Sequence, residues 1–242
     1  MTLETSTWAW LGVVALALGT VPSLWFLLVD RENRRYYAVL AAITGIATVA
    51  YVTMALEIGT VDAPGEVVWY APRYVDWLLT TPLLLLYLAM LSKPGRRNLI
   101  LLIGLDVIVI GTGAGAVLTE GVISWVLFSA GGLAYLGIVY LLVEAIPASA
   151  SFASERVAIV FMKLRNITVV LWTMYPVVWL LAPQGIGWLT LGTEMMLIVY
   201  LDVLTKAVFV LIALNGRDVL SDLATAGVES TDAVGQTVVS GD

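Results

Sequence analysis

The chain has 242 residues, of which 60% are hydrophobic and 12% are charged. A soluble domain carries roughly 25% charged residues, so this composition excludes an ordinary soluble globule. The chain has no cysteine and no histidine, which excludes disulfides, thiolate metal sites and imidazole bases. We therefore expect no metal site and no enzymatic activity, and the net charge of -6 gives no basis for binding nucleic acid.

Apolar runs separated by polar breaks predict helices that span a membrane. Each run is long enough to cross about 30 Å of hydrocarbon at about 1.5 Å per residue. The predicted helices cover residues 8–29, 37–57, 71–92, 98–118, 122–143, 158–182 and 190–214. The expected fold class is an all-α membrane protein with one seven-helix bundle over residues 1–214. We expect the polar tail at 215–242 to be disordered.

Basic residues occur in every second connection between these helices. Ten of the twelve Lys and Arg residues lie at 31–35, 93–97, 156–165 and 217. Because basic loops stay on the cytoplasmic side, the N-terminus is expected outside and the C-terminus in the cytoplasm. The chain is therefore predicted to be a multi-pass protein of the cell membrane, surrounded by the lipid bilayer.

A few charged residues fall inside the predicted spans, where each costs roughly 2.5–3.5 kcal/mol at the centre of the membrane. Asp202 and Lys206 are four residues apart, and Arg73 and Asp76 are three apart, so each pair shares a helix face. Asp106 lies alone in the fourth predicted helix. A structural ion-pair network and a proton, ion or cofactor site both fit this pattern.

Lys206 favours the cofactor interpretation. It lies near the middle of the last predicted helix, too far from either interface for its side chain to reach water. A desolvated lysine becomes a neutral amine more readily, which is the state that forms a Schiff base with an aldehyde. The protonated Schiff base would need a carboxylate counterion, which Asp76 or Asp202 can provide while Arg73 balances the second negative charge.

Aromatic residues accompany these charges at helical spacing. For any single tryptophan, an interfacial belt or ordinary core packing is the better explanation. Together with glycines on neighbouring helices, however, the set predicts a long slot with bulky walls that suits a flat apolar ligand. The bulky residues are Trp77, Trp172, Tyr175, Pro176 and Trp179, and the small ones are Gly113, Gly131 and Gly132.

The chain resembles the microbial (type 1) rhodopsins, which bind retinal as a Schiff base on a lysine of the seventh helix. The resemblance covers essentially residues 8–214. It rests on the runs APRYVDWLLTTP at 71–82, RNIT at 165–168, WTMYPVVW at 172–179 and YLDVLTK at 200–206.

The resemblance implies a role for each matching residue. Lys206 would carry all-trans retinal, Asp76 would be the primary counterion and proton acceptor, and Asp202 would be the second counterion. Arg73 would bridge this cluster and balance its charge. The implied pocket consists of Trp77, Thr80, Val109, Gly113, Phe128, Trp172, Tyr175 and Trp179.

Two positions on the proton path distinguish a sensor from a pump within this family. Outward proton pumps have a carboxylate where this chain has Tyr87, eleven residues after Asp76. A phenol with an ordinary pKa of about 10 is a poor donor, so a slow photocycle is expected. Pumps also release protons through two glutamates, of which this chain has Glu194 but has Gln184 at the other position.

Positions that the resemblance links to signalling also favour a sensor over a pump. In phototaxis receptors resembling haloarchaeal sensory rhodopsin II, a hydroxyl residue at the place of Thr205 bonds to the helix 6 tyrosine, here Tyr175. A threonine bonded to its own helix is an equally good interpretation of that residue alone. Thr190 and Tyr200 match positions that contact a two-helix membrane transducer of the methyl-accepting type, although a lone tyrosine on a lipid face more often serves packing.

The expected function is therefore a photoreceptor for phototaxis that signals through a transducer packed against helices 6 and 7. A light-driven outward proton pump is the alternative, and Asp106, which the pumps share, weakens the sensory assignment slightly. A seven-helix receptor without retinal would have no reason to place Lys206 four residues after Asp202. The oligomeric state stays open, with a homo-oligomer among the alternatives.

Overall fold

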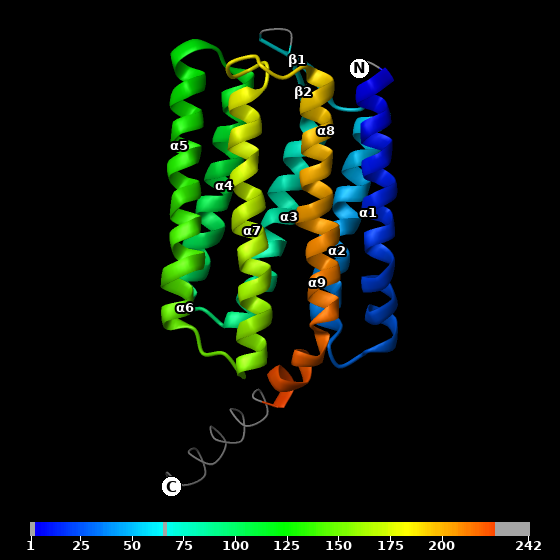
Figure 1. The fold of residues 1–242 in the computed structure, drawn as a ribbon, viewed down its shortest axis with the longest axis vertical. Helices are drawn as coiled ribbons and strands as arrows, with labels where there is room; N and C mark the ends of the chain where they lie inside the picture. Colours follow the sequence, from blue (N-terminus) through cyan, green and yellow to red (C-terminus); the bar gives the residue numbers. More distant parts are fainter. Residues whose placement is uncertain (1–2, 65–66, 226–242) are drawn as a thin grey trace, which may run out of the picture.

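The computed structural model describes residues 3–64 and 67–225, which form a bundle of long helices and one short hairpin (Figure 1). Seven of the described helical stretches are long and apolar enough to span a membrane, so the predicted count is confirmed. The long helices are α1 (Leu3–Val29), α2 (Arg34–Ala55), α3 (Ala71–Ser92), α4 (Arg96–Leu118), α5 (Gly121–Tyr140), α7 (Glu155–Leu181) and α8 (Leu191–Asp202).

Shorter elements complete the bundle. In two of the spans a wide π-helical turn interrupts the α-helix, and the span continues beyond that turn. The short elements are β1 (Thr60–Ala63), β2 (Val67–Tyr70), η1 (Leu141–Ala145), α6 (Ile146–Ser149), η2 (Val203–Val208), α9 (Phe209–Asn215) and η3 (Arg217–Val219). The fifth span thus reaches residue 149 rather than 143, and the seventh runs without a break from α8 through η2 to α9.

Local sequence explains several helix ends. Pro72 opens α3, where its missing N–H costs no hydrogen bond, and Lys93 ends that helix in a left-handed conformation. Ser154 and Thr190 cap α7 and α8, because each side chain accepts a hydrogen bond from the backbone N–H three residues later. These caps place the two helices that carry most of the candidate site.

The bundle has two different ends, which we call the hairpin end and the tail end (Figure 1). At the hairpin end β1 pairs antiparallel with β2, with Thr60 opposite Tyr70. Ala63 and Val67 of this hairpin are buried in a cluster with Val117 of α4. The hairpin therefore covers this end of the bundle.

The tail half of the bundle is a solid hydrophobic core. Its largest fully buried side chains include Tyr87 of α3, Phe161 of α7 and Phe209 of α9. The ring of Tyr87 contacts the ring of Phe209 edge-on, with the centroids 5.9 Å apart. Side chains packed in this way fill this part of the bundle.

The π-helical turn η2 packs tightly against α1. A Cβ atom on Gly19 would lie 2.7 Å from the Cβ of Ala207, so a glycine is needed where α1 crosses this turn. Single π-helical turns are frequent at functional sites. This turn carries Lys206.

The prediction of a disordered tail from residue 215 is wrong for the part that the structure describes. Residues 217–225 form helical turns, and Val219, Leu220 and Leu223 are buried in the core at the tail end. Asp222 also accepts a 2.6 Å hydrogen bond from Ser154 at the start of α7. Burial of these apolar side chains orders the segment. The rest of the predicted tail, 226–242, lies outside the described residues.

Candidate functional site

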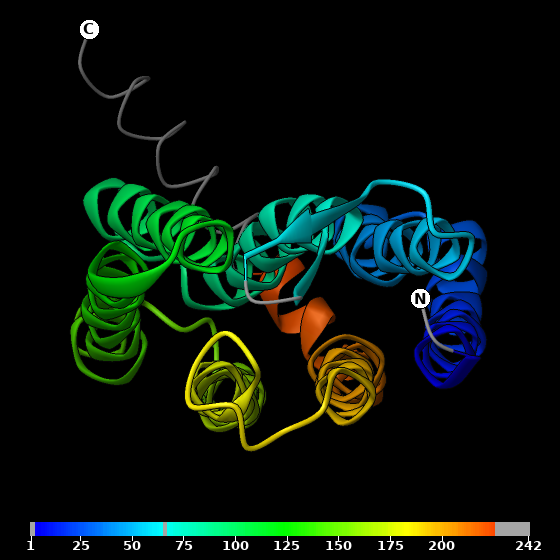
Figure 2. The ribbon, with the colours of Figure 1, turned by 90° about the horizontal axis from the view of Figure 1, so that it is seen from above.

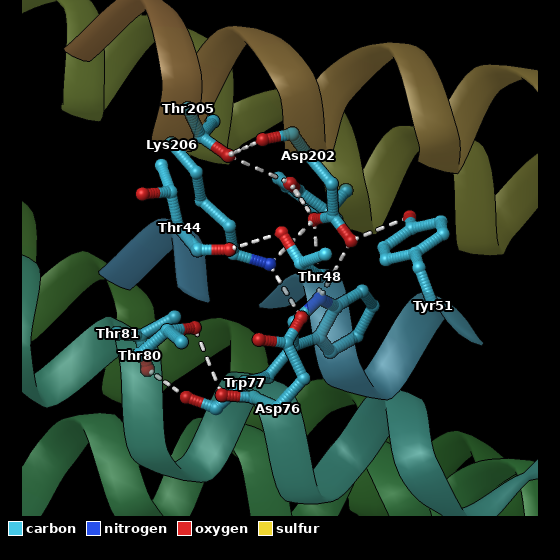
Figure 3. A network of polar contacts seen from close by, with 11 residues as sticks. Thr44, Thr48, Tyr51, Asp76, Trp77, Thr80, Thr81, Asp202, Thr205 and Lys206 are labelled. Carbon is cyan, nitrogen blue, oxygen red and sulfur yellow. Dashed lines mark hydrogen bonds and ion pairs between the residues drawn. The ribbon is translucent and has the colours of Figure 1, made fainter. Parts of the chain in front are cut away.

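The centre of the site is an ion pair between two helices. Lys206 donates a 2.6 Å hydrogen bond from Nζ to Oδ2 of Asp76 on α3, and the same nitrogen lies 3.3 Å from Oδ1 of Asp202 (Figure 3). All three side chains are at most 1% exposed. A buried amine between two carboxylates confirms that the three residues form one cluster.

The two carboxylates have different surroundings. Asp202 accepts hydrogen bonds from the hydroxyls of Tyr175 and Tyr51, at 2.6 Å and 2.7 Å, and from the indole of Trp77 at 3.1 Å (Figure 3). By contrast, Oδ1 of Asp76 is buried without a hydrogen-bond partner. Asp202 thus lies among neutral hydrogen-bond donors, whereas Asp76 keeps an open acceptor atom beside the amine.

Tyr51 of α2 is a site residue that sequence reasoning missed. Its ring is completely buried, and a Cβ atom on Gly12 would lie 2.6 Å from it, so the glycine makes room for the ring against α1. A single tyrosine within an apolar span carries no pattern that separates it from a packing residue. Only its hydrogen bond to Asp202 reveals its role.

Arg73 does not form the predicted bridge to the carboxylates. Its Nη2 atom contacts the sulfur of Met195 at 3.1 Å, and its guanidinium lies over the ring of Tyr70, 5.0 Å from the centroid. Its Nε atom is buried without a partner. Among the described residues, the ion pairs of Asp76 and Asp202 are those with Lys206. The side chain of Arg73 extends along α3 towards the hairpin end, because Met195 and Tyr70 provide its packing surface there.

A cavity opens next to Lys206 and extends between α3, α4, α5 and α7. Most of the predicted pocket residues line it: Trp77, Val109, Gly113, Phe128, Trp172, Tyr175 and Trp179. Thr80 does not line it, and the neighbouring Thr81 does so instead, because one residue turns the helix by about 100°. Thr81 also donates a 2.8 Å hydrogen bond to Asp106, which places that carboxyl group in the cavity wall.

The cavity walls are flat and aromatic. Phe128 of α5 stacks on Trp179 of α7 with the ring centroids 4.2 Å apart, and Trp77 meets Tyr175 edge-on at 5.2 Å. A Cβ atom on Gly113 would meet nothing within 4 Å, so open space takes the place of a side chain there. A long, flat, apolar ligand fits between such walls.

The predicted contact between helices 6 and 7 is present, and so is the alternative, because the Thr205 hydroxyl also donates a 3.4 Å hydrogen bond to the carbonyl of Asp202 on its own helix. The hydroxyls of Tyr175 on α7 and Thr205 on η2 lie 3.2 Å apart, and Tyr175 also donates to Asp202. Thr205 is therefore linked through one tyrosine to the carboxylate cluster.

The residues present fit a retinal chromophore. The cavity ends at a buried amine, its walls are aromatic, and Asp76 has a buried oxygen atom that lacks a partner. An aldehyde ligand needs an amine of this kind for covalent attachment and a carboxylate beside it to balance the resulting charge.

Comparison with known proteins gives the family. Residues 3–220 match the sequence model of a family described as bacteriorhodopsin-like protein. The chain belongs to this family. Sensory rhodopsin-2 of Natronomonas pharaonis is 41% identical over 219 residues, which cover 89% of this chain and 90% of that protein.

Two solved structures show the same fold. The thermophilic rhodopsin from Rubrobacter xylanophilus is 39% identical, with a TM-score of 0.86 over 91% of this chain and 99% of that one. A light-driven proton pump from Leptosphaeria maculans is 28% identical, with a TM-score of 0.84 over 92% and 98% of the two chains. The chain is thus a multi-pass membrane protein of the rhodopsin type, and members of this family carry a retinal chromophore.

In this member of the bacteriorhodopsin-like family, the remaining predicted positions lie outside the carboxylate cluster. Tyr87 is buried in the core of the tail half, and Glu194 accepts a 3.1 Å hydrogen bond from Gln184 near the hairpin end. Thr190 caps α8 and is exposed, and Tyr200 is 62% exposed on the same helix. The last two residues are therefore accessible to a partner in the membrane.

Proposed function

We propose that the protein is a retinal-binding photoreceptor for phototaxis, with its hairpin end outside the cell and its tail end in the cytoplasm. The observation that carries this proposal is the Lys206 amine, 2.6 Å from Asp76 at the end of an aromatic cavity. The relative from Natronomonas pharaonis, named a sensory rhodopsin, supports a sensory function.

Retinal, held covalently as a Schiff base on Lys206, would supply light absorption and a change of shape about a double bond. The protein supplies the counterion and the proton path. Asp76 receives a proton from the Lys206 nitrogen at Oδ2, which lies 2.6 Å away, and its Oδ1 atom has no hydrogen-bond donor. Asp202 lies farther from this nitrogen, at 3.3 Å, and its oxygen atoms already accept hydrogen bonds from Tyr51, Tyr175 and Trp77.

A slow return of the proton suits a receptor better than a pump. The buried carboxylates of the described residues are Asp76, Asp106 and Asp202. Tyr87 instead lies among hydrophobic side chains in the tail half. The Schiff-base nitrogen must therefore recover its proton through an apolar core, which gives a signalling state time to act.

The signal is proposed to leave the site through helices 6 and 7. A change in the cavity moves Tyr175, and the contact of Tyr175 with Thr205 transmits the strain to η2. A two-helix membrane transducer of the methyl-accepting type would pack against α7 and α8, where Thr190 and Tyr200 are exposed. Such a partner would detect a small displacement of the seventh span.

A light-driven outward proton pump is the second candidate. The proton pump of Leptosphaeria maculans has the same fold, and the open acceptor atom of Asp76 would serve a pump equally well. The two functions are compatible, because a receptor without its transducer can still move protons.

The first experiment adds all-trans retinal to the purified apoprotein and records the visible spectrum. We expect an absorption band shifted to long wavelength from that of free retinal, and its absence would refute the proposal. The second experiment illuminates cells that contain the protein with or without a co-expressed transducer. Phototaxis that depends on the transducer would support the receptor, whereas sustained light-driven acidification without any phototaxis would favour the pump.

A further inference from the structure

We propose that the cavity takes up its ligand sideways from the bilayer, between α5 and α7, and that Tyr135 closes this opening. The inference rests on the proposed function, because it takes the ligand to be a flat apolar molecule that dissolves in lipid. Seen from above, α7 stands between α5 and α8 on one side of the bundle (Figure 2). Three observations support an opening on this side.

The first observation is that both ends of the described bundle obstruct a flat apolar ligand. Tyr87, Phe161 and Phe209 are all at most 2% exposed in the core of the tail half. At the hairpin end, Ala63 and Val67 are buried on Val117, and Trp179 packs against the same cluster. The cavity also reaches Gln184 and Glu194 at this end, which are joined by a hydrogen bond. A ligand moving along the bundle axis would have to disrupt this polar pair or one of the two clusters.

The second observation is that α5 presents a glycine without a side chain to the cavity between Phe128 and Tyr135. Gly132 lines the cavity, and a Cβ atom there would meet nothing within 4 Å. Nearer the hairpin end, the Phe128–Trp179 stack closes the space between α5 and α7. The thin part of the wall therefore lies around Gly132 and Tyr135, and it begins one helical turn beyond Phe128 along α5.

The third observation is that Tyr135 reaches from the cavity to the lipid-facing surface. Its side chain lines the cavity, and its hydroxyl donates a 2.8 Å hydrogen bond to the carbonyl of Val169 on α7. The hydroxyl also lies 2.8 Å from that of Thr173, which is exposed and does not line the cavity. At this level Tyr135 therefore extends from the cavity to an exposed residue of α7.

This contact is suited to opening and closing. Lipid offers no water to compete for the hydroxyl, so the bond holds the two helices together until Tyr135 rotates. Pro176 follows Thr173 by three residues and removes one backbone hydrogen bond of α7, so this helix can bend close to the contact. We infer that breaking the Tyr135 bond lets α7 swing away from α5 far enough to admit the ligand.

The test measures the rate of ligand uptake in the full-length apoprotein reconstituted in lipid vesicles. All-trans retinol is the first probe, because it lacks the aldehyde and its binding can be followed by quenching of the cavity tryptophans without covalent attachment. All-trans retinal is the second probe, followed by the growth of the shifted absorption band. The variants are Tyr135→Phe and Thr173→Val, with Tyr140→Phe as the control, a tyrosine that is 63% exposed on the same span.

We expect Tyr135→Phe to accelerate uptake of both probes about fivefold, the effect of losing one hydrogen bond. Thr173→Val should accelerate uptake less, because the bond from Tyr135 to Val169 survives, and the double variant should add little to Tyr135→Phe. Normal final binding at rates equal to the wild type and to Tyr140→Phe would overturn the lateral route alone. Failure of the wild type to bind either probe would overturn the proposed function, and this inference with it.

Discussion

Lys206 and Asp76 are 130 residues apart in the chain, and their side chains form a 2.6 Å hydrogen bond at the centre of the bundle. The second oxygen of Asp76 has no partner, whereas Asp202 has several. This asymmetry between two carboxylates beside one amine leads to most of the predictions that follow.

Replacing Lys206 with alanine should abolish covalent retinal binding, because the chain then lacks a buried amine. The change leaves two buried carboxylates without their cation, at a cost of about 3–5 kcal/mol. The double variant Lys206→Ala with Asp76→Asn removes one of those charges and tests the same point in a more stable protein. Borohydride reduction followed by mass spectrometry detects the adduct. Lys163→Ala, at an exposed lysine of α7, should bind retinal normally, and an adduct in either Lys206 variant would refute the assignment.

Replacing Asp76 with asparagine should shift the absorption of the bound chromophore to longer wavelength. The carboxylate localises the positive charge on the Lys206 nitrogen, and its loss lets that charge spread along the polyene. Asp106→Asn is the matched control, since Asp106 lines the cavity but bonds to Thr81 rather than to Lys206. If the spectrum of Asp76→Asn equals that of the wild type, the counterion role passes to Asp202.

Asp202→Asn should lower the stability of the protein, because it weakens the acceptor for the hydroxyls of Tyr51 and Tyr175. Leaving such buried donors poorly paired costs about 1–3 kcal/mol. Thermal denaturation of the apoprotein measures the effect, with Asp76→Asn as the comparison. A melting temperature of Asp202→Asn equal to that of the wild type would show that the donors around Asp202 do not stabilise the fold.

Replacing Thr205 with alanine should uncouple the signal from the photochemistry. The variant loses the 3.2 Å contact with Tyr175 but keeps Lys206, Asp76 and the cavity, so its photocycle should survive. Cells that carry the variant with its transducer should lose phototaxis, and Thr205→Ser should restore it. Normal phototaxis in the alanine variant would contradict this signalling route and leave the receptor assignment intact.

Replacing Tyr87 with aspartate should speed the return to the dark state and reduce its dependence on pH. Tyr87 follows Asp76 by eleven residues, about 16 Å along α3, so a carboxylic acid there could supply a proton from the tail half. Wild-type recovery should slow as the pH rises and accelerate when azide is added as a diffusible proton carrier. Tyr87→Phe should keep both properties, and a wild-type cycle that is fast and insensitive to azide would favour the pump.

Contacts in the site could be predicted from the sequence when both residues lie on one helix. Asp202 and Lys206 were expected on one face because four residues make about one helical turn, and they are 3.3 Å apart. The partners of Asp202 on other helices were not predictable in the same way. Tyr51 was missed, and Thr80 was expected in the cavity wall where Thr81 lies, because one residue turns a helix by about 100°.

The sequence by itself determined the seven spans, the buried lysine and the aromatic character of its surroundings. These features follow from hydrophobic length and helical periodicity, which are local properties of the chain. Only the tertiary structure decided that Asp76 keeps an open oxygen, that Arg73 turns to Met195, and that residues 217–225 pack on the core. Each of these depends on how helices distant in sequence rotate and pack against one another, and close packing selects one arrangement from many that share the same local pattern.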